Sequence, residues 1–527
     1  MSQPLRRLAA LLSFSLLAAG ALRAQDPAVP PAQDPAVTAA QTPDVTGSTA
    51  VPPPATPPLT LEECISRALR RNFDIEIGRH NPSIAKDQID VAKGPYELQL
   101  AVTGSHGETK SGFSGPGSAT GTNKVSDLRV GVDQRLVTGT SLGASSSLDR
   151  SSTNPALIFN PAYDADLTLS ARQSLLRGFG SEIGKAPIER AKIGLQRANL
   201  DFQGQILEVI QSTENAYFNL AFARGDLAVR EFSLTLAQRL YDEAKTRRLT
   251  GVATDLDVLT GEVGVANARR ALLEAGQAVK DRQDALLALI GQFELDAPVG
   301  VVQFQDAPSA PPVYANSLTL ARQHQPEYLA AKAAIEQYKI DVKLAHDDAK
   351  PDLSVGAAVG VNGNNRSSGS AYGDAFDRQN HSWQVDFAFN YPWGRDAGRA
   401  RERQSRSTLS REEARLRQLE QFLEVNVRAG VRSVETNIES VRIAALASSL
   451  SQRQYELEKA RFDAGLSTSR RVLEAQDDLE TAKVSELQAR IALHSSIAAL
   501  HRLEGTGLQY YSAVVQQDAA AEQTPQP

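Results

Sequence analysis

The chain has 527 residues, which is long enough for two to four globular domains. Its formal net charge of −6 argues against a nucleic-acid partner. A single cysteine, Cys64, excludes a disulfide framework within the chain, and we expect this residue to be buried in a helix.

The N-terminal segment has the features of a secretory signal. Residues 1–24 contain Arg6 and Arg7, then an apolar run, then small residues that end at Ala24. Residues 25–58 are rich in Pro, Ala and Thr, a composition that predicts an extended, disordered linker. The folded part of the chain is therefore expected to start near residue 59.

The first folded segment changes from a helical to a strand pattern. Residues 59–93 predict helix, with an interruption at Pro82 and an end at Pro95. Apolar and polar residues then alternate in four stretches, which Gly-, Ser- and Asn-rich loops separate. The stretches are residues 98–102, 128–132, 142–148 and 165–171. A barrel strand in a membrane shows this weak pattern of alternation, whereas a membrane-spanning helix needs about 18 apolar residues in a row.

A long helical rod follows these strands. Residues 180–249 contain no proline after Pro187 and have a helix-forming composition, which predicts a rod of roughly 100 Å. A glycine-containing tip leads into a returning helix over residues 254–290. Residues 293–312 contain several prolines and read as a linker.

The same plan then starts again. Residues 318–348 predict helix, Pro351 breaks it, and residues 353–361 alternate as a strand. In the stretch 383–393 the apolar face consists of Trp383, Val385, Phe387, Phe389, Tyr391 and Trp393. Its other face is mostly polar, as lipid outside and water inside would require. The alternative is a strand that covers a soluble core.

The second rod, residues 395–463, has a regular seam. Its four-three spacing is typical of a coiled coil and comprises Val427, Val431, Val434, Ile438, Val441 and Ala445. The first rod is less regular, since Arg224 and Glu231 interrupt its apolar positions. A returning helix is predicted over residues 469–503, and residues 509–527 read as a polar tail.

Two matched tips indicate an internal duplication. Residues 239–259 align with residues 453–473 at an offset of 214, so that Gly251 and Thr254 meet Gly465 and Thr468. Ile89 and Ile340 align at an offset of 251, which leaves 37 extra residues (251 minus 214) in the first half. This length fits an extra β-hairpin near residues 126–150. The two repeats are then residues 59–292 and 313–508.

The order of these elements resembles the TolC family of outer-membrane efflux proteins. The resemblance is carried by the strand exits QSLLRGFG (173–180) and NYPWG (390–394) and by the tips RRLTG and RFDAG. It implies an α+β membrane protein: a homotrimer that shares one outer-membrane β-barrel, continued by a long periplasmic α-helical barrel of coiled coils. Four strands per subunit would give the family's twelve-stranded pore, and the place of the extra hairpin stays open.

Physical reasoning also requires several copies of the chain. The strands of one subunit would leave unpaired edges in lipid, where unpaired backbone groups are prohibitively costly. The seams of the rods need packing partners as well. We therefore expect outer-membrane lipid and further copies of the chain as partners.

The resemblance places a gate at the periplasmic tips, where acidic side chains ring the pore and an adaptor protein docks. The family's acidic pair in the second tip reads Arg471 and Glu474 here, so the first position has the opposite charge. Asp255 is explained equally well as an acid favoured by the helix dipole. The candidate tip and gate residues are Gly251, Thr254, Asp255, Asp257, Gly465, Thr468, Arg471 and Glu474.

We expect no enzyme and no catalytic, cofactor-binding or metal site. The stretch 178–185 departs from a phosphate-binding loop because its first glycine comes one residue early and Ala186 replaces the Ser or Thr. The histidines show no metal-ligand spacing.

The predicted function is an outer-membrane exit duct of a tripartite efflux system. Small molecules would pass from an inner-membrane transporter and a periplasmic adaptor to the outside. One alternative is the outer-membrane component of type I protein secretion. A second is a non-transporting periplasmic coiled-coil scaffold or stalk, against which the apolar face of residues 383–393 argues, since a stalk needs no lipid-facing strand.

Overall fold

The structure, a computed structural model, describes residues 59–112, 120–154, 160–251, 253–292, 300, 302, 310–377, 380–391, 393–394 and 396–511. The predicted signal segment, the linker 25–58, most of the linker 293–312 and the tail from residue 512 lie outside the described residues. The described residues all belong to one compact unit, Thr56–Pro527.

The first helical segment breaks at Asn72. Helix α1 (Leu61–Arg71) ends there and α2 (Phe73–Lys93) begins, so the predicted interruption at Pro82 is wrong. The Asn72 Oδ1 accepts hydrogen bonds from the amides of Asp74 and Ile75, at 2.8 and 3.4 Å, and its Nδ2 donates to the Leu289 carbonyl at 3.0 Å. This asparagine caps α2 and ties it to a distant helix. A short 3₁₀ turn, η1 (Gly94–Tyr96), then leads to the sheet.

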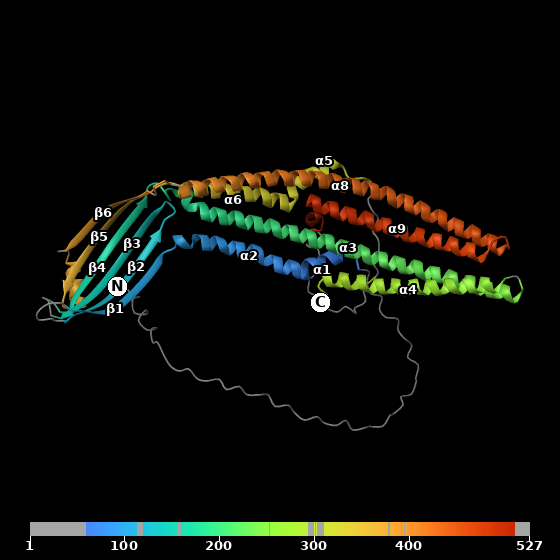
Figure 1. Cartoon of the computed structure of the whole chain (residues 1–527), viewed down its shortest axis with the longest axis horizontal. Coiled ribbons are helices and arrows are strands. Elements are labelled where there is room, and N and C mark those ends of the chain that lie inside the picture. Colours follow the sequence, from blue (N-terminus) through green and yellow to red (C-terminus); the bar gives the residue numbers. More distant parts are fainter. Residues whose placement is uncertain are drawn as a thin grey trace, which may run out of the picture. The chain divides into compact units, whose positions relative to one another are not determined.

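The described strands form one antiparallel sheet in the order β1-β2-β3-β4-β5-β6 (Figure 1). They are β1 (Gln99–Gly112), β2 (Thr120–Arg135), β3 (Thr140–Asn154), β4 (Ala162–Ser174), β5 (Asp352–Asn365) and β6 (His381–Asn390). Each predicted alternating stretch overlaps one of these strands, although the stretches 98–102 and 383–393 extend beyond β1 and β6. The hairpin of β2 and β3 is therefore part of the same sheet as the strands from both halves.

The pairing register gives the sheet an apolar and a polar face. Directly opposite residues point to the same side of a sheet. One row of partners runs across all six described strands: Leu100, Val132, Ala144, Leu169, Val359 and Trp383. The next row along, on the opposite face, includes Asp133, Ser170 and Gln384. The alternation read from the sequence thus continues across the whole sheet.

A short helix, α7 (Ser368–Phe376), was not predicted. It packs against β4 and β5, and the Tyr372 hydroxyl lies 3.0 Å from the Ser146 Oγ of β3. Ala165 of β4 is fully buried, and a side chain at Gly363 of β5 would overlap the backbone of α7. Four of its nine residues are Gly or Ser, which hides helix from a composition-based reading.

The remaining helices lie side by side in pairs (Figure 1). In the first half α3 (Ser181–Leu249) packs against α4 (Asp255–Leu289), and in the second half α8 (Asp396–Asp463) packs against α9 (Ser469–Glu504). The predicted helix 318–348 is two helices, α5 (Tyr314–His324) and α6 (Pro326–Asp348). The break falls at Gln325, because the residue before a proline is disfavoured in helix.

Three apolar clusters lie along these helices. The first joins α1 to α3 and α4 and contains Cys64, which is fully buried as predicted. Burial raises the pKa of its thiol to about 12. The second confirms the predicted seam, since Val427, Val431 and Val434 of α8 are buried in it. The third lies near the tips and joins α3 to α8 and α9.

The predicted polar tail, residues 509–527, contains a buried residue near its start. Tyr511 packs into the first cluster, and its hydroxyl donates to the Glu214 Oε1 of α3 at 2.6 Å. The composition of residues 509–527 concealed this contact, because a single aromatic side chain makes it with a partner 297 residues away. The described end of the chain is thus anchored to the first rod.

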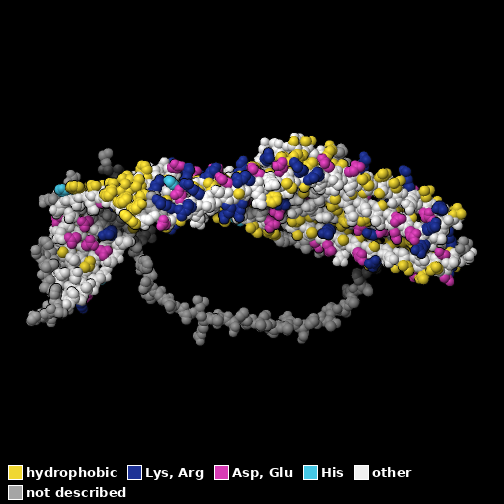
Figure 2. All heavy atoms as spheres, turned by 45° about the horizontal axis from the view of Figure 1, so that its top comes forward, with side chains coloured by type: hydrophobic (Ala, Val, Ile, Leu, Met, Phe, Trp, Pro, Cys, Tyr) yellow, Lys and Arg dark blue, Asp and Glu magenta, His cyan; other side chains and the backbone are white. Residues whose placement is uncertain are grey.

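Figure 2 shows hydrophobic side chains gathered where the sheet meets the helices, while charges of both signs are scattered along the helical part. Among the described residues, no helix is both long enough and apolar enough to cross a membrane.

Candidate functional site

The two predicted tips are the turns that connect α3 to α4 and α8 to α9. Gly251 and Gly465 have φ values of 77° and 75°, a left-handed conformation that favours glycine. The Gly251 amide donates to the Arg248 carbonyl at 3.0 Å, and the Gly465 amide donates to the Phe462 carbonyl at 2.9 Å. Each glycine therefore closes the preceding helix in the same way.

The two returning helices begin differently. Thr254 and Asp257 form a capping box: the Thr254 Oγ1 accepts from the Asp257 amide at 3.3 Å, and the Asp257 Oδ2 accepts from the Thr254 amide at 2.9 Å. The hydrogen bonds that the Asp257 carboxylate accepts, first from the Thr254 amide and then from the Thr254 hydroxyl, hold its pKa below its ordinary value. Thr468 occupies the same position before α9, but within the described residues its side chain makes no capping bond.

Side-chain contacts join the first tip to the second. The Ser469 Oγ donates to the Asp257 Oδ1 at 2.9 Å. The Arg247 Nη1 donates to the Phe462 carbonyl at 3.0 Å, and its guanidinium lies 4.1 Å from the centre of the Phe462 ring. Asp463 is 3.8 Å from the same guanidinium. We call this group of residues (Arg247, Asp257, Phe462, Asp463 and Ser469) the tip lock.

The other three charged candidates stay apart from the tip lock. Asp255 pairs with Arg248 of its own hairpin, and Glu474 pairs with Arg470 at 2.9 Å, one helical turn away. Arg471 is exposed, and in the described part of the chain no ion pair involves it. The structure thus brings only Asp257, among the predicted acids, to the opposite tip.

Sequence reasoning missed Arg247 and Ser469 as members of this site. The sequence alignment of the two tips pairs Arg247 with Arg461, but Arg461 contacts Glu458 of its own helix at 3.4 Å. The repeat pattern therefore pointed to both arginines and could not say which one crosses to the other half. Sequence reasoning also missed Asp477. Burial raises the pKa of its carboxyl group, and the charges of Asp478 and Glu474 raise it further.

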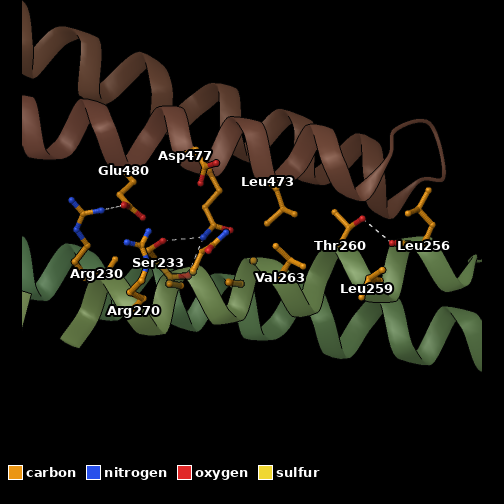
Figure 3. A pocket seen from close by; sticks show the side chains of 16 residues that line it. Arg230, Ser233, Leu256, Leu259, Thr260, Val263, Arg270, Leu473, Asp477 and Glu480 are labelled. Atoms are coloured by element: carbon orange, nitrogen blue, oxygen red, sulfur yellow. Dashed lines mark hydrogen bonds and ion pairs between the residues drawn. The ribbon is translucent and has the colours of Figure 1, made fainter. Parts of the chain in front are cut away.

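A groove of about 600 Å³ lies beside the tip lock, between α4 and α9 with α3 below them. Figure 3 shows Leu256, Leu259 and Leu473 along its apolar part. At its polar end Arg230 of α3 pairs with Glu480 of α9, and Gln476 donates to the Ser233 carbonyl at 2.9 Å. These contacts fix α9 on α3 and leave α4 as the groove's other wall.

The predicted lipid-facing residues all project from the surface of the single chain. Trp383 is 74% exposed, and Val385, Phe387 and Phe389 are exposed on the same face of β6. Strand β6 ends at Asn390, so Tyr391 and Trp393 lie beyond it. The Tyr391 ring stacks at 6.2 Å on Phe389 and meets the Trp393 ring edge-on at 6.3 Å. The row of aromatic side chains thus continues past the end of the strand, and Pro392 follows Tyr391 in the sequence.

Comparisons with known proteins agree with this architecture. A family model described as outer membrane efflux protein matches residues 64–292 and 318–506. The pyoverdine export outer membrane protein OpmQ of Pseudomonas putida is 26% identical over 398 residues, which cover 70% of this chain and 77% of OpmQ.

Solved channels share the fold. The structure of CusC superposes with a TM-score of 0.64 at 15% identity and covers 84% of this chain and 92% of CusC. The outer membrane protein VceC of Vibrio cholerae superposes with a TM-score of 0.63 at 16% identity and covers 84% of this chain and 96% of VceC. The chain thus belongs to the outer membrane efflux protein family, whose TolC-like channels are not enzymes and combine an outer-membrane sheet with a long periplasmic part.

Proposed function

We propose that three copies of this chain form the exit duct of a tripartite efflux system. An inner-membrane transporter and a periplasmic adaptor would deliver small molecules to the helical tunnel, and the barrel would release them outside. OpmQ is named for pyoverdine export, and this relative supports a small-molecule cargo. The duplicated tips support the assignment of two internal repeats.

The two edges of the sheet support closure by several copies. Within the described residues, β1 and β6 each have a partner on one side only. Their apolar side chains are exposed, including Leu100, Val102 and Phe387. Each unpaired backbone group in lipid costs several kcal/mol, so a stable membrane sheet must close on itself.

The contacts of the tip lock support the proposal that the duct is gated. Ser469 to Asp257 and Arg247 to Phe462 join the α3–α4 hairpin to the α8–α9 hairpin at the end of the tunnel. Opening would separate these hairpins, as an iris opens, and would break both contacts. A partner that binds the open arrangement more tightly would shift this two-state equilibrium.

The groove beside the tip lock is the place where we expect the adaptor to bind. It offers apolar side chains of α4 and α9 next to the half-buried ion pair of Arg230 and Glu480. A helix with an apolar stripe could lie along Leu256, Leu259 and Leu473. Binding there would act on α4 and α9, the helices that the tip lock joins.

Single-channel conductance in planar bilayers tests the gate. Ser469→Ala removes the bond to Asp257 and leaves the capping box of α4 intact, and Arg247→Ala removes the contacts to Phe462. A hydrogen bond to a charged group contributes about 1.5–3 kcal/mol, so each loss should raise the open fraction about tenfold or more. Glu262→Ala, which removes an exposed acid from α4, is the matched control and should leave the current unchanged.

The outcomes separate the alternatives. Currents that rise in both variants and not in the control support a duct held shut at its tips. Wild-type and variant channels with equal conductance refute the tip lock as the gate. Folded protein that never inserts contradicts the proposed duct altogether and favours the scaffold. Export of a polypeptide, but not of small molecules, by cells that carry the channel would favour type I secretion.

A further inference from the structure

The hairpin of β2 and β3 is fully paired on both sides. The register of β1 with β2 runs from Gln99–Asp133 to Gly112–Thr120, and that of β3 with β4 from Thr140–Gln173 to Ser151–Ala162. With 16 and 15 residues, β2 and β3 exceed the roughly 9–11 that a tilted strand needs to cross a membrane. They are as long as the strands beside them.

The apolar face of the sheet continues across the hairpin, interrupted on β3 by Ser146, whose Oγ lies 3.0 Å from the Tyr372 hydroxyl of α7. On β2 it comprises Leu128, Val130 and Val132, and on β3 it comprises Leu142, Ala144 and Leu148. Lys124 of β2 and Arg150 of β3 follow on the same face toward the end of the strands that lies away from the helices. An apolar band with charges at its margin is the pattern of a strand that faces lipid. A hairpin that projected into water would need no such band.

The opposite face of the hairpin is polar. Asp127 of β2, Asp149 of β3 and Asp164 of β4 lie in one row of paired residues. Arg129 lies on the same face of β2. This face continues that of β4 and β6, where Arg172 and Asp386 form an ion pair at 2.7 Å. The hairpin therefore has the same inner and outer sides as its neighbours.

The turn between β2 and β3 is built into the junction with the first rod. The Gly180 amide donates to the Thr138 carbonyl at 3.2 Å, and the Ser174 amide donates to the Gly139 carbonyl at 3.2 Å. A Cβ at Gly184 would overlap the Val137 carbonyl oxygen. The glycine-rich stretch 178–185, which resembles a phosphate loop only faintly, thus lets α3 approach this turn. The hairpin is held at both of its edges and at its inner end.

We propose that the β2–β3 hairpin forms part of the pore wall, so that three copies close a barrel of eighteen strands with β1 of one copy paired to β6 of the next. This inference rests on the proposed trimeric pore. The described residues supply six strands per copy, and an even number makes β1 and β6 antiparallel where copies meet. Barrel diameter grows roughly linearly with strand number, so the bore is about 1.5 times as wide as one of twelve strands.

Lipid exposure of adjacent residues on the hairpin tests this proposal. Cys64 is the only cysteine and is fully buried, so the full-length chain accepts single-cysteine labels without a background substitution. We would attach a nitroxide to Ala144→Cys and Ser145→Cys of β3, and to the reference pair Val385→Cys and Gln384→Cys of β6. Collision rates with oxygen report lipid exposure, and those with a water-soluble nickel chelate report water exposure.

The expected result is the same reversal in both pairs. Labels at 144 and 385 should favour oxygen, and labels at 145 and 384 should favour the nickel chelate. Water exposure at both 144 and 145, with 385 in lipid, would overturn the inference and leave the proposed duct intact. A label at 385 that is not in lipid would instead contradict the proposed membrane pore itself.

Electron cryomicroscopy of the trimer in lipid nanodiscs supplies the strand count directly. A cross-section with eighteen strands supports the inference. A cross-section with twelve strands, and three hairpins outside the wall, overturns it. The deletion of residues 120–154 is a matched variant, because β1 and β4 remain antiparallel and both loops at the outer end are retained. Its cross-section should contain twelve strands.

Discussion

Glu214 is a carboxyl group in the apolar core between α1, α3 and the end of the described chain. Burial raises its pKa, and the hydrogen bond from Tyr511 opposes that shift. Burial also raises the pKa of Tyr511, so its hydroxyl stays protonated and donates. A carboxyl group whose pKa is raised by folding contributes stability below its ordinary value of about 4.3 and loses it as pH rises through the raised value.

We predict that Tyr511→Phe destabilises the protein mainly at neutral pH. Above the raised pKa the variant leaves a buried carboxylate without its donor, at a cost of about 1–3 kcal/mol. In acid, where Glu214 is protonated, the cost should shrink. Thermal unfolding of the detergent-purified variant, at neutral pH and in acid, measures this cost. Tyr510→Phe, which removes the hydroxyl of an exposed tyrosine, is the control. An equal loss at both pH values would contradict the role of the carboxylate.

Folding shifts the pKa of Asp257 in the opposite direction to that of Glu214. Its hydrogen bonds, first of all from the Thr254 amide, lower its pKa, so the stability that it adds is present above its ordinary value. That stability is lost as pH falls through the lowered pKa.

We predict that wild-type conductance rises as pH falls below about 3.9, because a protonated Asp257 no longer holds Ser469 and Thr254 as a charged acceptor. Bilayer recordings over this range measure it. Asp257→Ala should conduct more than the wild type at neutral pH and should change less on acidification. A wild-type current that stays constant through this range would show that Asp257 does not control the gate.

The pairing of α3 with α4 depends on close approach near the first tip. A Cβ at Gly261 of α4 would lie 3.1 Å from the Cα of Tyr241 on α3, and backbone cannot move aside as a flexible side chain does. Gly276 lies farther along α4, and its Cβ would meet nothing within 4 Å in the single chain. Gly261 therefore allows the close approach of α3 and α4, whereas Gly276 has no such part in the single chain.

We predict that Gly261→Ala costs about 1–3 kcal/mol, since it forces the two helices apart. Gly276→Ala is the control in the same helix and should be neutral or stabilising by up to about 1 kcal/mol. Thermal unfolding, with limited proteolysis near the tip, compares them. Equal stability of the two variants would mean that α3 and α4 can separate at Gly261 without loss.

For the whole molecule, the two faces of the sheet decide how it lies in the membrane. Val385 and Gln384 are neighbours on β6 but point to opposite faces. An Arg on the lipid face at the bilayer midplane costs about 2–4 kcal/mol, whereas an Arg toward water is tolerated.

We predict that Val385→Arg lowers the amount of heat-resistant trimer in the outer membrane and that Gln384→Arg does not. Gel analysis of membrane fractions, after a high-salt wash that removes peripheral proteins, measures both variants. Equal yields of the two trimers would argue that this face of β6 does not lie in lipid.

Much of this fold could be predicted from local patterns. Alternation located every strand, the four-three spacing of Val427 and Val431 located the seam of α8, and Gly251 and Gly465 located the tips. These features depend on neighbours within a few residues, which set helix or strand period and turn conformation. The break at Asn72 and the helix α7 were missed, because a contact to Leu289 and packing on the sheet create them.

The sequence by itself determined the order of the elements, the alignment of the two tips at an offset of 214 and the two faces of each strand, since periodicity and matched segments are written along the chain. Only the tertiary structure decided that Arg247 rather than Arg461 reaches the other half, that Ser469 meets Asp257, and that β2 and β3 lie inside the sheet. Each of these joins residues far apart in sequence, so their energies depend on how the chain folds back rather than on any local pattern.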